Sequence, residues 1–252
     1  MEYVISQLRY QLTNFDKIPI RFKTTFLWRI ILLTVREMDK RLYERYGNTR
    51  WWPAETRDEV VIGTILTQNT SWSNVEKAID QLRLAGCLSL KCICTLESGK
   101  LETLIRSAGF FRQKAERLRN LSCSIVSRYG GLEKMITEPR EEVEKFLSSQ
   151  KGVGRETLDS ILLYALDFPE FVVDKYTLRI FSRTGIEQEP TIESVKEAVA
   201  SSGIRDPDAL KNLHGMIVYL GKDHCRTKPK CSGCPLLENC QYGHSLNERS
   251  AE

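Results

Sequence analysis

Four cysteines near the C-terminal end carry the most specific chemical pattern in this chain of 252 residues. Cys225, Cys231, Cys234 and Cys240 follow the spacing Cys-x5-Cys-x2-Cys-x5-Cys. Four thiolates this close together are typical metal ligands, and structural zinc usually draws on two Cys-x-x-Cys pairs. These cysteines contain one such pair, and a single cluster held by four close cysteines suits a [4Fe-4S] centre. We therefore expect an iron–sulfur cluster and keep zinc as the alternative.

Residues 150–157, Gln-Lys-Gly-Val-Gly-Arg-Glu-Thr, could bind a phosphate through their backbone. The apolar pattern predicts one helix over 139–147 and another from about Arg155, so the two glycines lie in the turn between them. Glycine accepts positive φ, and the N–H groups of such a turn attract a phosphate together with the positive end of the following helix. The pattern predicts a helix-hairpin-helix, which holds a nucleic acid by its backbone and reads no bases. The alternative is a plain helical corner.

Asp174 is the carboxylate that we expect to face a nucleotide held by this turn. It follows the apolar run Phe171-Val172-Val173 and precedes a helical pattern that contains Leu178 and Phe181. An aspartate at that position could simply cap the helix, which is worth roughly 1 kcal/mol. Asp174 is therefore a candidate for catalysis, for capping or for both.

Gly-Val-Gly-Arg, an apolar helix and Val-Val-Asp together resemble the helix-hairpin-helix DNA glycosylase superfamily, whose best-known member is endonuclease III. The resemblance implies a base excision repair enzyme acting on double-stranded DNA that contains damaged bases. In such an enzyme Asp174 is ionised, stabilises an oxocarbenium-like sugar and guides or deprotonates the attacking water. The residues that the resemblance places on the DNA backbone are Lys151, Gly152, Val153, Gly154 and Arg155, and Arg112 and Lys114 are further candidates for phosphate contact.

Two further motifs are similar to one branch of that superfamily, the monofunctional 3-methyladenine DNA glycosylases. Leu-Thr-Gln-Asn-Thr followed by an aromatic residue is one of them; glycosylases of the superfamily insert a side chain from this loop into the space left by a flipped nucleotide, and Gln68 holds the matching position, whereas Ser71 is expected to cap the helix that begins at Trp72. The motif Trp51-Trp52-Pro53 implies the walls of a base pocket, with ordinary core packing as the alternative. Trp72 and Lys222 match other positions near that pocket, and the alternative for Lys222 is a plain surface lysine. A positively charged alkylpurine over an indole face gains about 0.5–2 kcal/mol, so such a pocket could select damaged bases by charge.

Glu156 occupies the position that decides the reaction type. Bifunctional relatives carry a lysine directly after Gly-Val-Gly-Arg, and its amine forms a Schiff base with the sugar. A glutamate there, as in the alkylpurine branch, implies base release without strand cleavage, with Glu156 either assisting Asp174 or only complementing the helix dipole. The alternatives are a pyrimidine or mismatch glycosylase of the endonuclease III type and, from another class, a non-catalytic DNA-binding protein with a structural metal cluster.

The cysteine spacing also resembles the cluster loop of endonuclease III, although it is one residue shorter between the first two cysteines. Basic residues between these cysteines could hold the DNA backbone, with roughly 0.9 counterions released per phosphate neutralised; they are Arg226, Lys228 and Lys230. The other four cysteines are scattered, and we expect them to be inert: Cys87, Cys92, Cys94 and Cys123.

These motifs must be positioned by helices, because no β alternation of useful length occurs and the fold class is predicted as all-α. Helices are predicted over residues 1–12, 24–47, 59–66, 72–84, 101–107, 111–129, 192–200 and 207–220, the last capped by Asp206. We expect two lobes with the active cleft between them. One lobe combines 1–53 and 170–242 and carries the cluster, the other is a helical barrel over 54–169, and 243–252 forms a tail.

Composition agrees with this interpretation without proving it. A net charge of +4 and a pI near 8.6 are mildly basic, which is compatible with nucleic acid. The longest apolar run is too short for a membrane span, and no signal peptide is recognisable at the start. We expect an intracellular monomer that associates with the nucleoid through DNA.

Overall fold

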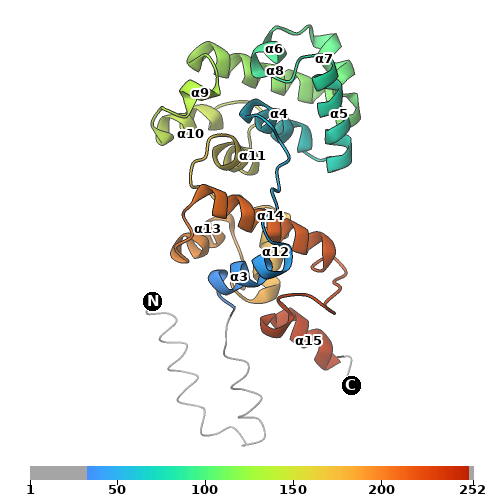
Figure 1. Ribbon diagram of the computed structural model, residues 1–252, viewed down its shortest axis with the longest axis vertical. Helices are drawn as coiled ribbons and strands as arrows, with labels where there is room; N and C mark the ends of the chain where they lie inside the picture. Colours follow the sequence, from blue (N-terminus) through green and yellow to red (C-terminus); the bar gives the residue numbers. More distant parts are fainter. Residues whose placement is uncertain (1–32, 250–252) are drawn as a thin grey trace, which may run out of the picture.

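A computed structural model describes residues 33–249, and every regular element in that range is helical, which confirms the all-α prediction. The helices form two tiers along the long axis of the molecule (Figure 1). The first tier contains α4 (Arg57–Thr67), α5 (Trp72–Leu84), α6 (Leu90–Thr95), α7 (Ser98–Leu104), η2 (Arg106–Ala108), α8 (Phe111–Tyr129), α9 (Leu132–Met135), α10 (Arg140–Ser148), α11 (Arg155–Ser160) and η3 (Ile161–Ala165). The second contains α3 (Val35–Tyr46), α12 (Lys175–Thr184), α13 (Ile192–Ser201), α14 (Pro207–Asp223), η4 (Leu237–Asn239) and α15 (Gln241–Arg249). Among the described helices, none combines the length and apolar character needed to cross a bilayer.

The helices around the predicted hairpin begin and end near the expected residues. α10 buries Val143, Phe146 and Leu147, the face that the sequence pattern selects. α11 begins at Arg155 as predicted, but the continuous helix expected beyond it changes at Ile161 into a π-helical turn, η3. Such wide turns are uncommon and often lie at functional sites.

Several predicted elements differ from the structure. The helix expected over 101–107 is shifted to α7, because the Glu97 carboxylate accepts hydrogen bonds from the amides of Gly99 and Lys100 and starts the helix early. The helix expected over 24–47 is not continuous, since Thr34 is an extended N-cap residue and α3 begins only at Val35. Residues 1–12 and 24–32 lie outside the described range. The short α6 and α9 were not predicted, because pieces of four to six residues carry too little periodicity.

The second tier is built around α14, which packs against α3 and α12. The predicted Asp206 cap is confirmed, because its Oδ2 accepts a hydrogen bond of 2.8 Å from the amide of Ala209. The predicted boundary between residues 242 and 243 falls inside α15, which packs on α12, so the expected tail is helical as far as Arg249.

Ion pairs connect the two tiers, and those of Lys196 are largely buried. Lys196 of α13 places its Nζ 2.7 Å from Asp159 Oδ2 of α11 and 2.9 Å from Glu170 Oε1 in the connecting segment. On another side, Arg57 of α4 lies 2.7 Å from Asp167, which also pairs with Lys211 of α14. The ends of the segment that leads to Asp174 are therefore fixed to both tiers.

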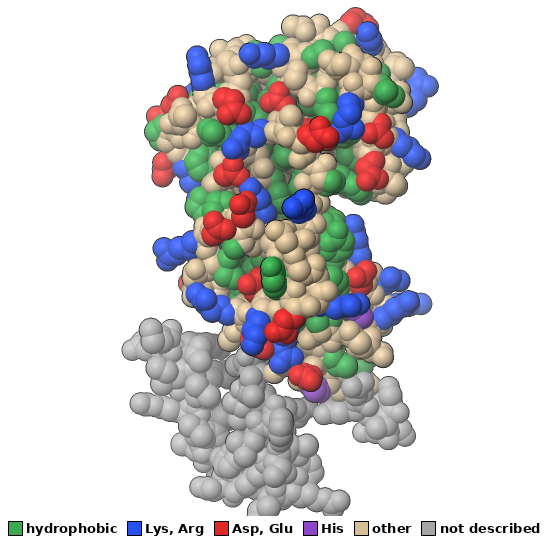
Figure 2. All heavy atoms as spheres, viewed as in Figure 1, with side chains coloured by type: hydrophobic (Ala, Val, Ile, Leu, Met, Phe, Trp, Pro, Cys, Tyr) green, Lys and Arg blue, Asp and Glu red, His purple; other side chains and the backbone are tan. Residues whose placement is uncertain are grey.

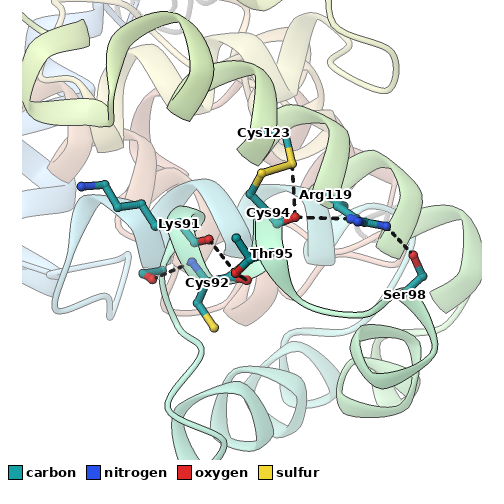
Figure 3. Close-up of a disulfide and its surroundings, with 8 residues drawn as sticks. Lys91, Cys92, Cys94, Thr95, Ser98, Arg119 and Cys123 are labelled. Carbon is teal, nitrogen blue, oxygen red and sulfur yellow. Dashed lines mark hydrogen bonds between the residues drawn. A yellow bond between two sulfur atoms is a disulfide. The ribbon is translucent and has the colours of Figure 1, made fainter.

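The four scattered cysteines are not inert, which corrects the prediction. Cys87 bonds to Cys92, and Cys94 bonds to Cys123. The second disulfide joins α6 to the middle of α8, and Arg119 donates to the carbonyl of Cys94 beside it (Figure 3). The paired cysteines are 5 and 29 residues apart in the sequence, and neither separation indicates by itself that the two cysteines form a pair. Only the fold brings Cys123 to Cys94.

Candidate active site and nucleic-acid interface

The hairpin turn between α10 and α11 requires glycine at its first glycine position. Gly152 has a φ of +89°, and a Cβ atom there would lie 2.5 Å from Cδ of Arg117. Val153 is buried and anchors the turn, whereas Gly154 is exposed, and a Cβ atom added to it would meet no other atom within 4 Å. The backbone at the start of α11 is therefore open to a partner, as a phosphate-binding turn requires.

The two basic side chains of the turn already have acidic partners. Lys151 Nζ lies 3.1 Å from Glu116 Oε1, and both side chains are exposed. Arg155 Nε lies 3.4 Å from Oδ1 of the buried Asp159. Exposed pairs of the first kind contribute roughly 0–1 kcal/mol, so a phosphate can compete with Glu116 for Lys151.

Gln68 joins the loop before α5 to the hairpin turn. Its Nε2 donates to the carbonyl of Gly152 at 2.9 Å and to Thr157 Oγ1 at 3.1 Å. Its Oε1 accepts from Arg117 Nη1 at 2.9 Å. Arg117, which packs over Gly152 and holds Gln68, was missed by the sequence analysis because an arginine on a polar helix face gives no distinguishing signal. Ser71 is the N-cap of α5, as predicted, but its side chain makes no capping hydrogen bond and instead approaches Ser73.

Lys114 is not a phosphate contact, which corrects a prediction. Its side chain is buried, with 2% exposure, and Nζ donates to the carbonyls of Leu66 at 2.7 Å and Ala108 at 2.8 Å. Burial lowers the pKa of Lys114 to about 8. The lysine thus joins the end of α4, just before Gln68, to the loop that precedes α8.

Phe110 lies on that second loop and was not singled out from the sequence. It is 70% exposed and has a φ of +46°, a conformation that is uncommon for a bulky residue. An exposed, strained aromatic is typical of a binding surface rather than of a core. Arg112, two residues later, is exposed with its Nε 3.9 Å from Glu102 and remains free to approach a phosphate.

Asp174 uses its two carboxylate oxygens differently. Oδ1 accepts hydrogen bonds from the amide of Thr177 at 2.8 Å and from its hydroxyl at 2.9 Å, so the predicted cap is present. Oδ2 takes no part in the cap and lies 3.9 Å from Nε2 of His214. The side chain is 12% exposed. The helix therefore fixes Oδ1 by hydrogen bonds, whereas Oδ2 takes no part in capping and could interact with a bound ligand.

An aromatic pocket lies in the first tier beside the segment that enters α4. It has a volume of about 330 Å³ and is lined by Trp52, Pro53 and Trp72 among others. The rings of Trp52 and Trp72 meet edge to face at 5.8 Å. Trp52 can lie against α4 because Gly63 has no side chain; a Cβ there would lie 3.2 Å from the indole. Three predicted pocket residues are thus brought together.

The same pocket carries charged residues that the sequence analysis did not identify: Glu76, and Arg83 paired with Glu59 and Asp80. Glu76 Oε1 accepts a hydrogen bond of 2.9 Å from the indole N–H of Trp72. Glu76 lines the pocket, so a negative charge is held beside an aromatic wall. Its distance of four residues from Trp72 along α5 is ordinary helix spacing and gave no separate signal.

Trp51 and Lys222 form a second group. Lys222 Nζ lies 4.6 Å from the ring centroid of Trp51, and that ring meets Tyr219 edge to face at 5.3 Å. Lys222 is exposed and lies over one of the aromatics that the sequence analysis assigned to the pocket. Burial lowers the pKa of Lys222, and the carboxylates of Asp223, Asp174 and Glu76 oppose that shift. Lys222 therefore lies within electrostatic reach of Asp174.

Glu156 lies in the first turn of α11 and is exposed, as expected. The surrounding protein nevertheless raises the pKa of Glu156 by desolvation, and the Asp174 carboxylate adds to this. Of the acidic residues predicted from the sequence, Asp174 and Glu156 are thus close enough to influence each other.

The four C-terminal cysteines are free of disulfides, unlike the other four. Burial raises the pKa of the Cys234 thiol to about 11, and the other three thiols add to that effect. Within residues 33–249 no group of three or more Cys, His, Asp or Glu side chains is arranged as a metal site. Arg183 donates to Cys225 Sγ and the amide of Gly243 donates to Cys240 Sγ, both at 3.4 Å. The exposed basic residues of this loop are Arg226, Lys228 and Lys230.

Acidic and basic side chains alternate over the face shown in Figure 2, and the molecule narrows between the tiers. That face carries no continuous basic field. Binding of a polyanion would therefore depend on particular backbone and side-chain donors, consistent with the small net charge of +4.

Comparison with known proteins of related sequence and fold identifies the family to which this chain belongs. A protein of Methanocaldococcus jannaschii named "Putative DNA repair glycosylase MJ1434" is 46% identical over 204 residues, covering 80% of this chain and 93% of the relative. The Helicobacter pylori 3-methyladenine DNA glycosylase bound to 1,N6-ethenoadenine superposes with a TM-score of 0.67 and 30% identity, covering 75% of this chain and 98% of its own. A non-covalent endonuclease III–DNA complex superposes with a TM-score of 0.70 and 22% identity, covering 86% of this chain and 99% of its own, which shows a shared fold. The family model of the HhH-GPD superfamily base excision DNA repair proteins matches residues 62–202, and the chain belongs to this superfamily of DNA glycosylases.

Proposed function

We propose that this protein is a monofunctional DNA glycosylase that releases alkylated purines such as 3-methyladenine from double-stranded DNA. The observation that carries the proposal is Asp174, whose Oδ1 is held by Thr177 while Oδ2 is left for the reacting sugar. The aromatic pocket is linked to this carboxylate through Tyr164, which lies 5.2 Å from the ring of Trp52 and bonds to His214 beside Asp174.

In this reaction the hairpin turn and α11 hold the DNA backbone through Lys151, Gly152, Val153, Gly154 and Arg155. The damaged nucleotide leaves the helix, and Gln68 fills the gap. As the bond between C1′ and the base breaks, the Asp174 carboxylate stabilises the positive sugar and orients a water. The water oxygen bonds to C1′, its proton passes to Asp174, and the base departs with the bonding electrons. Glu156 is a second carboxylate close to Asp174, and its negative charge also stabilises the positive sugar.

Selection of alkylated purines follows from the charge of the pocket. A cationic base between Trp52 and Trp72 gains from the indole faces and from the Glu76 carboxylate fixed to Trp72. Lys222 already occupies the face of Trp51 in the free protein, so the base enters on the side of Trp52 and Pro53. The likeness to a glycosylase named for 3-methyladenine, at 30% identity over nearly all of that chain, supports this substrate class.

The four free cysteines fit a [4Fe-4S] cluster by their donor chemistry. They lie in one loop, they influence one another electrostatically, and N–H groups of Arg183 and Gly243 already point at two of the sulfur atoms. When bound, the cluster would cross-link the loop and present Arg226, Lys228 and Lys230 to the DNA backbone. Anaerobically purified protein should be yellow-brown and contain iron and sulfide; stoichiometric zinc without iron would contradict this assignment.

We also propose the division into two lobes, residues 33–53 with 170–249 and residues 54–169, with the active site where they meet. The alternative function is a pyrimidine or mismatch glycosylase of the endonuclease III type. Lys222 favours that alternative, because it is an amine within electrostatic reach of Asp174.

The experiment that separates these functions uses end-labelled duplexes carrying single lesions. Release of alkylpurines, an intact strand before hot alkali and no adduct after borohydride would support the monofunctional assignment. Strand breaks before alkali, or a trapped complex that Lys222→Ala abolishes, would refute it. Release of pyrimidines in preference to alkylpurines would move the substrate class to the alternative.

A further inference from the structure

His214 is a buried titratable side chain that the reaction above does not use. It lies on α14 with 5% exposure, packed against η3 and the segment before Asp174. Its Nδ1 is 2.7 Å from the Tyr164 hydroxyl. Its Nε2 is buried, has no hydrogen-bond partner among the described residues, and lies 3.9 Å from Asp174 Oδ2. A polar atom in this state normally carries a cost, so its position calls for an explanation.

The environment selects one tautomer of the imidazole. The Tyr164 hydroxyl has a single proton, which can go to His214 Nδ1 at 2.7 Å or to the carbonyl of Lys211 at 3.2 Å. If it goes to Nδ1, the ring proton is on Nε2 and faces the carboxylate. If it goes to the carbonyl, a lone pair of Nε2 faces the carboxylate and repels it. The shorter contact and the electrostatics both favour the proton on Nε2.

The charged and titratable groups around the ring are few. Asp174 faces it from the N-terminus of α12, Tyr164 faces it from η3, and Phe171 contributes only an aromatic edge at 6.3 Å. Burial lowers the pKa of His214, and Asp174 opposes this shift. The ring is therefore neutral at physiological pH and can act as a hydrogen-bond donor to Asp174.

We propose that His214 is a positioning residue for Asp174, and this proposal rests on the catalytic assignment made above. In the free protein the gap of 3.9 Å between Nε2 and Oδ2 is too long for a hydrogen bond. When a nucleotide is bound, a small movement closes the gap, and Nε2–H fixes the free oxygen toward the sugar. Tyr164 maintains the required tautomer through Nδ1, in the same way that outer partners orient a catalytic histidine.

The proposal predicts a loss of rate that a hydrogen-bond donor at position 214 restores. Without a donor, the free oxygen of Asp174 is no longer held toward the sugar, and the single-turnover rate should fall about 10-fold, the size expected for one hydrogen bond to a charged group. A residue that only filled space would be replaced equally well by a side chain of similar bulk without a donor.

The test compares His214→Gln, whose amide can still donate toward Oδ2, with His214→Met, which has similar bulk and no donor. Single-turnover excision of 7-methylguanine, corrected for release without enzyme, is measured together with DNA affinity and thermal unfolding. We expect about a 10-fold loss of rate in His214→Met, a near-normal rate in His214→Gln and a smaller loss in Tyr164→Phe, with DNA affinity unchanged in all three. A normal rate in His214→Met overturns the positioning role, as does an equal loss in His214→Gln. If Asp174→Asn keeps its activity, the catalytic assignment itself fails, which is a separate outcome.

Discussion

Replacing Asp174 with asparagine separates its catalytic charge from its capping role. Asparagine is as good an N-cap as aspartate, so the hydrogen bonds to Thr177 can persist and stability should change little. The negative charge is lost. A carboxylate about 4 Å from a positive sugar stabilises it by about 4 kcal/mol at an effective dielectric constant near 20. The rate should therefore fall about 1,000-fold.

The matched control for this substitution is Asp206→Asn. Asp206 also caps a helix and accepts a 2.8 Å hydrogen bond from the third residue of that helix, but it belongs to the start of α14 and not to the site. Single-turnover base release, DNA affinity by fluorescence anisotropy and thermal unfolding should be measured for both variants. We expect normal DNA affinity in both and loss of base release only in Asp174→Asn. More than about a tenth of normal activity in that variant would refute the charge argument, because a tenfold loss corresponds to only about 1.4 kcal/mol.

Four further expectations concern the neighbouring interactions. Cys123→Ser should lower the free energy of unfolding by about 3.6 kcal/mol, as expected for opening a loop of this length, measured by urea titration; an unchanged value would show that the Cys94–Cys123 bond is dispensable. Arg117→Met should weaken DNA binding about 10-fold, because a hydrogen bond to Gln68 is lost, whereas Arg112→Met, which affects an exposed side chain, should have a smaller effect in the same binding titration. Glu76→Gln should reduce release of cationic 7-methylguanine about fivefold more than release of neutral 1,N6-ethenoadenine, and equal losses would show that the pocket does not select by charge. Burial lowers the pKa of Lys114 to about 8, from 10.5 in the unfolded chain. Between these pH values the unfolded state binds more protons than the folded state, so the free energy of unfolding rises with pH across that window. Lys114→Met should lose this rise, and urea titrations at pH 7.5 and 10 check it.

The parts of the fold that the sequence could predict depend on local pattern. The hairpin turn, the start of α11 and the Asp174 cap each follow from a few adjacent residues whose conformational preferences agree. The long α5 and α8 follow from sustained apolar periodicity. The resemblance then added Gln68 and the tryptophans, and the structure brings Trp52, Pro53 and Trp72 into one pocket.

The rest could not be predicted because it depends on contacts between distant segments. Gln68 meets Gly152 across 84 positions, and His214 meets Tyr164 across 50. A single histidine on an apolar helix face has no spacing that distinguishes it from a core residue. Lys114 illustrates the opposite error, since a lysine on a polar stretch suggested a surface contact and instead satisfies two buried carbonyls.

The buried ion pairs between the tiers are better explained by the position in which they hold the segment leading to Asp174 than by a contribution to the free energy of folding. A buried pair often stabilises a fold no more than apolar residues of the same volume would, because removing two charges from water is costly. Glu170 is nevertheless held by both Lys196 and Arg140, and it is separated from Asp174 only by the buried run Phe171-Val172-Val173. Asp174 belongs to the second tier, whereas the hairpin turn that would hold the DNA belongs to the first. A reaction that needs the carboxylate and the bound nucleotide in register requires the connection between the tiers to be rigid, and Glu170 supplies that rigidity at the point where the chain crosses.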